Sequence, residues 1–264
     1  MKRNIKISIM AGLLFFIAAA IAFAASTTTE EISKPEKVSQ ESISKSSEIL
    51  KILDSNPENL KTKVVFDELQ NKTIYEIENG KYFIDMDTNN NLVGIHSKNL
   101  STNLESSNCN LDQAKKFILK KYIELGLPEN YELNYIEKYD DLIWQANFEK
   151  NYNGMYNKFE SVKVYFIPDN EEIIALGVFD EKVKSSEVAI AENEAKQTVM
   201  NYLNITEDEI ISTKLSIEKA NNFYNKESKD TSIHSTWVIQ TKDNSIIYVD
   251  AQTNNVIGGD SINE

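Results

Sequence analysis

Two stretches of the sequence offer carboxylate and amide oxygens at the alternate spacing of a calcium-binding loop. The first is YFIDMDTNNNLVG, residues 82–94, which places Asp85, Asp87 and Asn89 at alternate positions. The second is the related stretch YVDAQTNNVIGG, residues 248–259. A calcium loop of this kind requires glycine at its sixth position and a bidentate glutamate at its twelfth.

Both stretches lack both of these residues. The sixth and twelfth positions hold Asn90 and His96 in the first stretch and Asn255 and Ser261 in the second. The flanking residues alternate between apolar and polar types, which is typical of strands. We therefore interpret both stretches as β-hairpin turns, where asparagine is favoured because it tolerates a positive φ, and we predict no metal site.

The other residues that could carry chemistry are His96, His234 and Cys109. A zinc-protease helix needs two histidines four residues apart with a glutamate between them, and a serine triad needs a histidine that takes the serine proton. His234 lies among serines in TSIHSTW, but at the start of a predicted strand without a nucleophile elbow. The acidic pairs of YDD and NEE lie at predicted turns and do not provide the fixed separation of glycosidase carboxylates. We predict no catalytic residues and no cofactor.

A repeat organises most of the chain. Tyr82, Tyr165 and Tyr248 are each 83 residues apart, and each belongs to an apolar strand, a polar turn, a second apolar strand and a glycine. Helical segments at residues 110–122 and 191–203 correspond at an offset of 81, and further alternating strands follow each one. The repeated unit is therefore one helix followed by about four antiparallel strands, in which the helix covers one face of the sheet.

The helix starts can be located from their capping residues. Asn110 and Gln113 have the spacing of a capping box. Glu192 and Glu194 place negative charge in the first turn of the other helix, where the helix dipole favours it. Cys109 directly precedes the first cap, so we predict a packing role for this lone thiol. The pattern also predicts that four residues of the first helix share its inward face: Leu111, Ala114, Ile118 and Tyr122.

The first residues resemble an export signal. Three basic residues precede an apolar run at residues 7–24, which ends in the small-x-small sequence Ala22-Phe23-Ala24. We predict cleavage before Ala25; the alternative is an uncleaved anchor helix formed by residues 7–24, a length that is marginal for spanning a bilayer. In either case, the rest of the chain lies outside the cytoplasm.

The charge balance restricts the classes of partner. The chain carries a net charge of −13, and loss of the three basic residues in 1–24 would bring it to −16. Nucleic acid and anionic lipid require a basic face and are disfavoured as main partners. A cationic protein, peptide or ion remains compatible, as does an acidic surface that only keeps the protein dispersed.

We predict an α+β protein of tandem helix-and-sheet units. Residues 25–45 are too polar to offset their ordering entropy and are predicted to form a flexible linker. The predicted divisions are a signal peptide at 1–24, the linker at 25–45, a partial N-terminal unit at 46–104, a middle unit at 105–185 and a C-terminal unit at 186–264.

The last unit resembles the PepSY domain, named for peptidase propeptides and the germination protein YpeB. The residues that carry the resemblance are the helix start ENEAKQTVMNYL, the strand TWVIQT and the hairpin IIYVDAQTNNVIGG, which has asparagine where the family often has glycine. The middle unit is similar to the repeats of the secreted YcdB/YcdC group through IWQANF, YNGM and SVKVYFIPDNEEIIALGVF. The resemblance covers about residues 60–260 and is weakest in the first unit.

This resemblance implies a secreted, non-enzymatic module that binds protein or peptide and modulates an extracellular or cell-wall protease in trans. Tyr152, Met155 and Tyr156, around the Asn153-Gly154 turn, are the predicted binding residues, because Tyr and Met offer broad contact area at low entropy cost. The alternative for them is that they merely flank a core. Extended peptides pairing with an open sheet edge are a second option. The alternative function is a membrane-anchored envelope scaffold in wall or spore assembly, and an unrecognised hydrolase ranks last.

Overall fold

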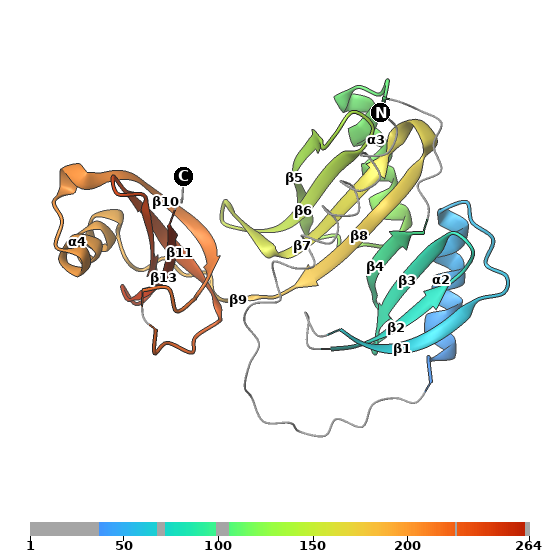
Figure 1. Ribbon diagram of the computed structural model, residues 1–264, viewed down its shortest axis with the longest axis horizontal. Helices are drawn as coiled ribbons and strands as arrows, with labels where there is room; N and C mark the ends of the chain where they lie inside the picture. The colour runs from blue at the N-terminus through green and yellow to red at the C-terminus, as the bar shows by residue number, and fades with distance from the viewer. Residues whose placement is uncertain (1–36, 68–71, 99–105, 225, 262–264) are drawn as a thin grey trace, which may run out of the picture. The chain divides into compact units, whose positions relative to one another are not determined.

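The computed structural model describes residues 37–67, 72–98, 106–224 and 226–261 (Figure 1). The predicted signal peptide and the first part of the predicted linker lie outside these ranges. The chain divides into two compact units. One comprises residues up to Thr102 together with Ile173–Ala175, and the other comprises Asn103–Glu172 and the residues from Leu176 onward.

The first unit contains one helix and a meander of four antiparallel strands. Helix α2 packs on β2 and β3, and the side chains of Leu50, Ile77 and Ile84 are fully buried. Residues 40–45, predicted as linker, are helical, because Ser39 caps the helix by accepting the backbone N–H of Ser42 at 3.0 Å. The elements in order are α2 (Gln40–Ile52), β1 (Lys61–Asp67), β2 (Lys72–Glu78), β3 (Tyr82–Asp87) and β4 (Leu92–Ser97).

The second unit begins with another helix and four antiparallel strands, the last of which contains the three residues Ile173–Ala175 that are grouped with the first unit. Helix α3 covers one face of the strands (Figure 1), where the Tyr122 ring stacks on Phe148 with 3.9 Å between centroids. Asn110 and Gln113 form the predicted capping box, with both hydrogen bonds at 3.0 Å. The elements are α3 (Leu111–Glu124), β5 (Tyr131–Lys138), β6 (Trp144–Tyr152), β7 (Met155–Ile167), the 3-10 helix η2 (Pro168–Asn170) and β8 (Glu172–Asp180), with the strands in the order β8-β7-β6-β5.

A third helix and a further sheet complete the second unit. Helix α4 packs on β11 and β12, where Ala195 and Val199 meet Ile239, Ile247 and Val249. Glu192 and Glu194 lie in the first turn of α4, as predicted, and Glu194 also accepts the backbone N–H of Ala191 at 3.0 Å. The elements are β9 (Val183–Ser185), α4 (Glu192–Leu203), η3 (Glu207–Glu209), β10 (Ile210–Lys219), β11 (Ile233–Thr241), β12 (Ser245–Asp250) and β13 (Val256–Ser261); the sheet order is β10-β11-β12-β13, and β9 pairs with β11 in parallel.

The repeat predicted from the tyrosine spacing is present in the structure. Tyr82, Tyr165 and Tyr248 lie on β3, β7 and β12, which are the third strands after α2, α3 and α4. Trp144 and Trp237 lie on the second strands, β6 and β11. Both indoles donate to the residues just before the helix of their own segment, to Ser107 Oγ at 3.4 Å and to Ile190 O at 2.9 Å. Each tryptophan therefore fixes the start of a helix to its sheet.

A left-handed asparagine ties a hairpin turn to a helix in two of the three segments. Asn90 and Asn254 have φ values of 65° and 60°. The side-chain oxygen of Asn90 accepts from the Ser42 hydroxyl of α2 at 2.7 Å, and that of Asn254 accepts from the Thr198 hydroxyl of α4 at 2.9 Å. The Asn-rich turns thus have the hairpin role predicted for them.

Removing the Phe148 ring should destabilise the second unit. Phe148 is 2% exposed, so Phe148→Ala is expected to lower the free energy of unfolding by about 3–5 kcal/mol through lost burial and a cavity. Urea unfolding followed by tryptophan fluorescence measures this change. Ile123→Ala on the outer face of α3, at a side chain that is 78% exposed, should change it by less than about 0.5 kcal/mol. Equal losses in the two variants would contradict this assignment of the core.

Candidate functional site

The carboxylates at the calcium-like turns close the turns themselves. Asp87 Oδ1 accepts the backbone N–H groups of Asn89 and Asn91 at 2.9 and 2.8 Å. Asp250 Oδ1 accepts the backbone N–H groups two and three residues further along, at 2.7 and 2.9 Å. Such Asx-type bonds stabilise a tight turn. These hydrogen bonds explain why aspartate stands at positions 87 and 250 without a bound ion being needed.

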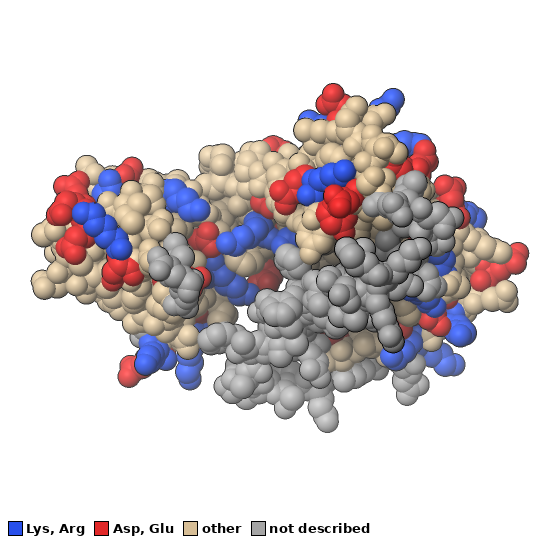
Figure 2. Space-filling model, turned by 45° about the horizontal axis from the view of Figure 1, so that its top comes forward, with Lys and Arg blue, Asp and Glu red and all other residues tan. Residues whose placement is uncertain are grey.

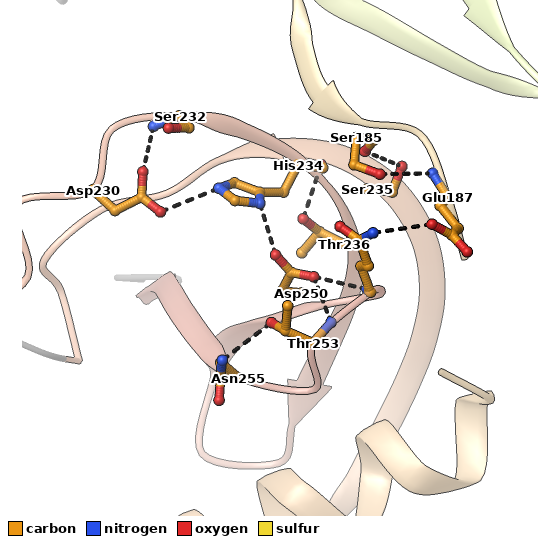
Figure 3. A network of polar contacts seen from close by, with 11 residues as sticks. Ser185, Glu187, Asp230, Ser232, His234, Ser235, Thr236, Asp250, Thr253 and Asn255 are labelled. Atoms are coloured by element: carbon orange, nitrogen blue, oxygen red, sulfur yellow. Dashed lines mark hydrogen bonds and ion pairs between the residues drawn. The ribbon is translucent and has the colours of Figure 1, made fainter. Parts of the chain in front are cut away.

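The second oxygen of Asp250 belongs to a polar network around His234 (Figure 3). His234 is buried near the start of β11, and its side chain is 8% exposed. Its Nδ1 lies 2.7 Å from Asp250 Oδ2, and its Nε2 lies 3.2 Å from Asp230 Oδ2. The imidazole is therefore held between two carboxylates that come from different segments, the end of β12 and the connection that precedes β11.

Asp230 is itself positioned by the chain around it. Its Oδ1 accepts the backbone N–H of Ser232 at 2.8 Å. This hydrogen bond holds the pKa of Asp230 below its usual value; partial burial opposes the shift, and the Ser232 side chain and the charge of His234 add to it. Asp230 is therefore anionic at neutral pH and faces the ring as a hydrogen-bond acceptor.

The geometry of this network indicates a structural role rather than a catalytic one. We call His234, held between Asp230 and Asp250, the His234 clamp. A histidine that acts as a general base needs a ring nitrogen directed at the group it deprotonates, whereas both nitrogens of His234 face carboxylates. The nearby hydroxyls are also engaged, because Ser235 donates to Ser185 O at 3.2 Å and Thr236 donates to His234 O at 3.0 Å. The network joins β9, β11 and the β12–β13 turn.

His96 and Cys109 belong to different compact units, and each has its own local contacts. His96 is exposed on β4, and its Nε2 lies 3.5 Å from Asp85 Oδ2. Cys109 is half-buried just before α3, and burial raises the pKa of its thiol, with the charge of Asp169 adding to the effect. A raised pKa leaves less of the nucleophilic thiolate, which agrees with a packing role for this residue.

The predicted binding residues lie at the tip of the β6–β7 hairpin. Asn153 and Gly154 have φ values of 55° and 92°, as the tight turn requires. Met155 is 7% exposed and packs with Ile217 and Ile233 of the C-terminal sheet. Its side chain therefore joins the hairpin to that sheet.

The two tyrosines of the hairpin are more accessible than Met155. Tyr152 is half-buried beside the same cluster, and its hydroxyl donates to Glu160. Tyr156 is also half-buried, and its hydroxyl donates to Glu132 Oε2 at 3.1 Å. Whether these residues bind a partner stays a prediction.

A second accessible surface, on α3, was not found from the sequence. Leu111 is 51% exposed, so its predicted place on the inward face is wrong; Ala114, Ile118 and Tyr122 are buried as predicted. The outward face also carries two other large apolar side chains, Leu119 at 37% and Ile123 at 78% exposure. Three exposed lysines lie on the same helix: Lys115, Lys116 and Lys120. We call Leu119, Ile123 and these lysines the α3 outer face.

Charged side chains elsewhere do not separate by sign on the visible surface. Figure 2 shows acidic and basic residues interspersed over the described parts of that face. In the part of the chain that the structure describes, no helix is both long and apolar enough to span a membrane.

Comparison with known proteins supports the fold type. No protein-family model and no curated protein matches the chain. Among solved structures, the Bacillus megaterium YpeB C-terminal domain has a TM-score of 0.50 and 12% sequence identity, and the match covers 87% of this chain and 100% of that one. A protein of unknown function from Clostridium leptum DSM 753 has a TM-score of 0.27 and 9% identity, covering 59% and 97% of the two chains. The first similarity shows an α+β fold of the YpeB type, and the second is too weak to carry an argument.

The stability supplied by Asp230 should depend on pH. The lowered pKa means that the carboxylate stabilises the fold above its ordinary value of 3.8 and that this contribution is lost as pH falls through the lower folded value. We expect the difference in urea midpoint between the native chain and Asp230→Asn to be largest near neutral pH and to shrink below about pH 4. The exposed Asp180→Asn serves as the control. A difference that stays constant from pH 7 to pH 2 would contradict the prediction.

Substitutions of Met155 and Tyr156 should differ in their effect on the free energy of unfolding. Met155→Ala is expected to lower the free energy of unfolding by about 2–5 kcal/mol, because it empties a packed cluster. Tyr156→Phe removes one hydroxyl at an accessible site and should change it by less than about 0.5 kcal/mol. Chemical denaturation of the two variants tests this difference, and a larger loss from Tyr156→Phe would reverse the assignment.

Proposed function

We propose that the chain is an extracytoplasmic, non-enzymatic module of the PepSY type that binds a protein or peptide and modulates an extracellular or cell-wall protease. The observation that carries the proposal is the α3 outer face. Leu119 and Ile123 are one helical turn apart and both exposed, as in amphipathic helices that are recognised by a groove on a partner. The YpeB-type fold and the clamped geometry of His234 are compatible with recognition rather than chemistry.

The large apolar side chains of α2 and α4 differ in their surroundings from Leu119 and Ile123 on α3. Of the large apolar side chains on α2, Ile49 and Leu50 are buried. On α4, the exposed Tyr202 donates its hydroxyl to Tyr224 O at 2.9 Å, and the two rings meet edge to face. Leu119 and Ile123 can make no such hydrogen bond, and they lie among lysines in a chain of net charge −13. Lys115 and Lys116 would offer positive charge to acidic groups of a partner at this face, whereas Lys120 pairs with Glu124 at 3.6 Å.

We keep Tyr152 and Tyr156 as a second proposed contact region. Met155 then acts indirectly, since its packing against Ile217 and Ile233 fixes the hairpin that carries the tyrosines. The similarity of the middle segment to the YcdB/YcdC repeats also stays a prediction.

The apolar run at residues 7–24 favours a second candidate, an envelope scaffold anchored by that run and acting in wall or spore assembly. Mass spectrometry of the extracellular fraction separates the two candidates. A chain that begins at or near Ala25 supports the secreted module, whereas a chain found only in the membrane fraction and retaining residues 7–24 supports the scaffold.

Affinity capture from the secretome with the full chain as bait tests the main proposal. We expect recovery of a protease whose activity on a peptide substrate falls when the chain is added. The double variant Leu119→Ser, Ile123→Ser should weaken this inhibition at least tenfold, equivalent to about 1.4 kcal/mol of binding free energy. Ile211→Ser, at an apolar residue of β10 that is 55% exposed, is the matched control. Equal inhibition by the double variant and the native chain would exclude the α3 outer face.

A further inference from the structure

The sequence contains two Asn-Gly dipeptides, and both lie at hairpin turns. Asn79-Gly80 connects β2 to β3, and Asn153-Gly154 connects β6 to β7. A backbone nitrogen can attack the side-chain amide of the asparagine that precedes it, and glycine hinders this attack least because it has no Cβ. The reaction requires a side-chain amide that can turn toward the nitrogen. The surroundings of the two asparagines differ in this respect.

The Asn79 side chain is held by hydrogen bonds at both of its polar atoms. Its Nδ2 donates to Ser55 Oγ at 2.8 Å and to Asn56 O at 2.9 Å. Its Oδ1 accepts the backbone N–H groups of Lys81 and Tyr82 at 2.9 and 2.7 Å. Asn79 is also buried, at 7% exposure, so these bonds are costly to break without water to replace them. Its amide is therefore fixed away from reaction.

The Asn153 side chain is much less restrained. Asn153 and Gly154 are both exposed at the tip of the β6–β7 hairpin. Among the residues that the structure describes, none forms a hydrogen bond with the Asn153 side chain. Exposed loop tips also open locally at low free-energy cost. The amide of Asn153 can therefore change its orientation while the rest of the protein stays folded.

One exposed hydrogen bond restrains the nitrogen that would attack. The Gly154 N–H donates to Asn151 Oδ1 at 2.7 Å, and this bond must break before the nitrogen can react. Asn151 is oriented from the neighbouring strand, because its Nδ2 donates to Glu132 Oε2 at 3.0 Å. The Tyr156 hydroxyl donates to the same carboxylate oxygen at 3.1 Å. Asn151 therefore slows the reaction of the turn.

We propose that Asn153 is a site of spontaneous deamidation whose rate Asn151 restrains. The Gly154 nitrogen loses its proton and forms a bond to Asn153 Cγ. The Cγ–Nδ2 bond then breaks, ammonia leaves with the proton, and a cyclic succinimide remains. Water adds to one of the two ring carbonyls and opens the ring to aspartate or isoaspartate. Water is the only co-reactant, and no electrons are transferred.

Both products would change the tip of the hairpin. Aspartate adds a negative charge beside Tyr152. Isoaspartate adds a methylene group to the main chain of a turn whose two residues, both at positive φ, set the register of β6 and β7. The reaction would thus alter the surface formed by Tyr152 and Tyr156. The modification goes beyond the proposed function and does not rest on it.

Incubation of the folded full chain at neutral pH in heavy-oxygen water, followed by mass spectrometry of its peptides, tests the proposal. Hydrolysis of the succinimide places labelled oxygen in the converted residue. We expect Asn153 to convert at least about tenfold faster than Asn79, because Asn79 requires a larger local opening. In concentrated urea, which unfolds both turns, the two asparagines should convert at similar rates.

A variant tests the role of Asn151. Asn151→Ala should raise the rate at Asn153 about threefold or more, because one exposed hydrogen bond no longer holds Gly154. Asn134→Ala is the control, since it removes an amide from β5 that donates to Glu149 rather than to the turn. This variant should leave the rate at Asn153 unchanged. Circular dichroism compares the folding of both variants with that of the native chain.

Three results would contradict the proposal. Labelling of Asn153 in urea but not in the folded chain would show that the turn prevents the attack. Equal rates at Asn79 and Asn153 in the folded chain would show that local contacts do not control the reaction. An unchanged rate in Asn151→Ala would overturn the restraining role of Asn151. None of these outcomes depends on whether the α3 outer face inhibits a protease.

Discussion

Burial of a single sheet face by a single helix is the constraint on which the rest of this structure depends. Four consecutive antiparallel strands present one apolar face that must be removed from water. In each segment the helix that precedes the strands supplies the cover, as the stacking of Tyr122 on Phe148 shows for α3. One helix cannot cover both faces, so the second face must be polar or be covered by something else. Gln145, Asn147 and Glu149 show how the middle segment meets this requirement.

The polar contacts that recur in the segments all serve this arrangement. Trp144 and Trp237 bind the residues just before α3 and α4, and Asn90 and Asn254 bind hydroxyls on α2 and α4. These bonds fix the position of each helix along its sheet, which the non-directional hydrophobic effect alone cannot do. The clamp around His234 extends the same principle to a connection between strands. Both ring nitrogens of His234 face carboxylates, and this contact holds the segment that carries Asp230 in place. Neither nitrogen is directed at a group that it could deprotonate.

Short patterns in the sequence predict those structural features that depend on interactions between nearby residues. The capping box at Asn110, the Asn153-Gly154 turn and the repeat of tyrosine strands depend on neighbours within a few residues, and all three are present. Features that arise from pairing between distant segments were not predictable. His234 meets Asp250 only because β11 and β12 pair, and Asn147 is flanked by Lys163 only through the β6–β7 register. Leu111 fits the inward period of α3, but it is the first helical residue and its side chain is 51% exposed.

The edges of the sheets are less suited to recognition than their faces. An unpaired edge attracts any extended chain, and proteins block such edges with bulges, lysines or local cover. Both β5 and β10 contain a register shift, and β1 carries exposed lysines. At β13, the Asn221 side chain donates to Gly259 O at 3.0 Å and accepts from Gly259 N at 3.1 Å, and so occupies the backbone groups that a further strand would use.

Glycine is required at position 259 because a Cβ there would lie 2.3 Å from the Tyr224 ring and 2.2 Å from a backbone oxygen of β12. The chain segment at residues 221–224 therefore closes this edge by direct contact. With the edges guarded in these ways, the binding that we propose would depend on side chains at exposed surfaces, such as Leu119 and Ile123 on α3.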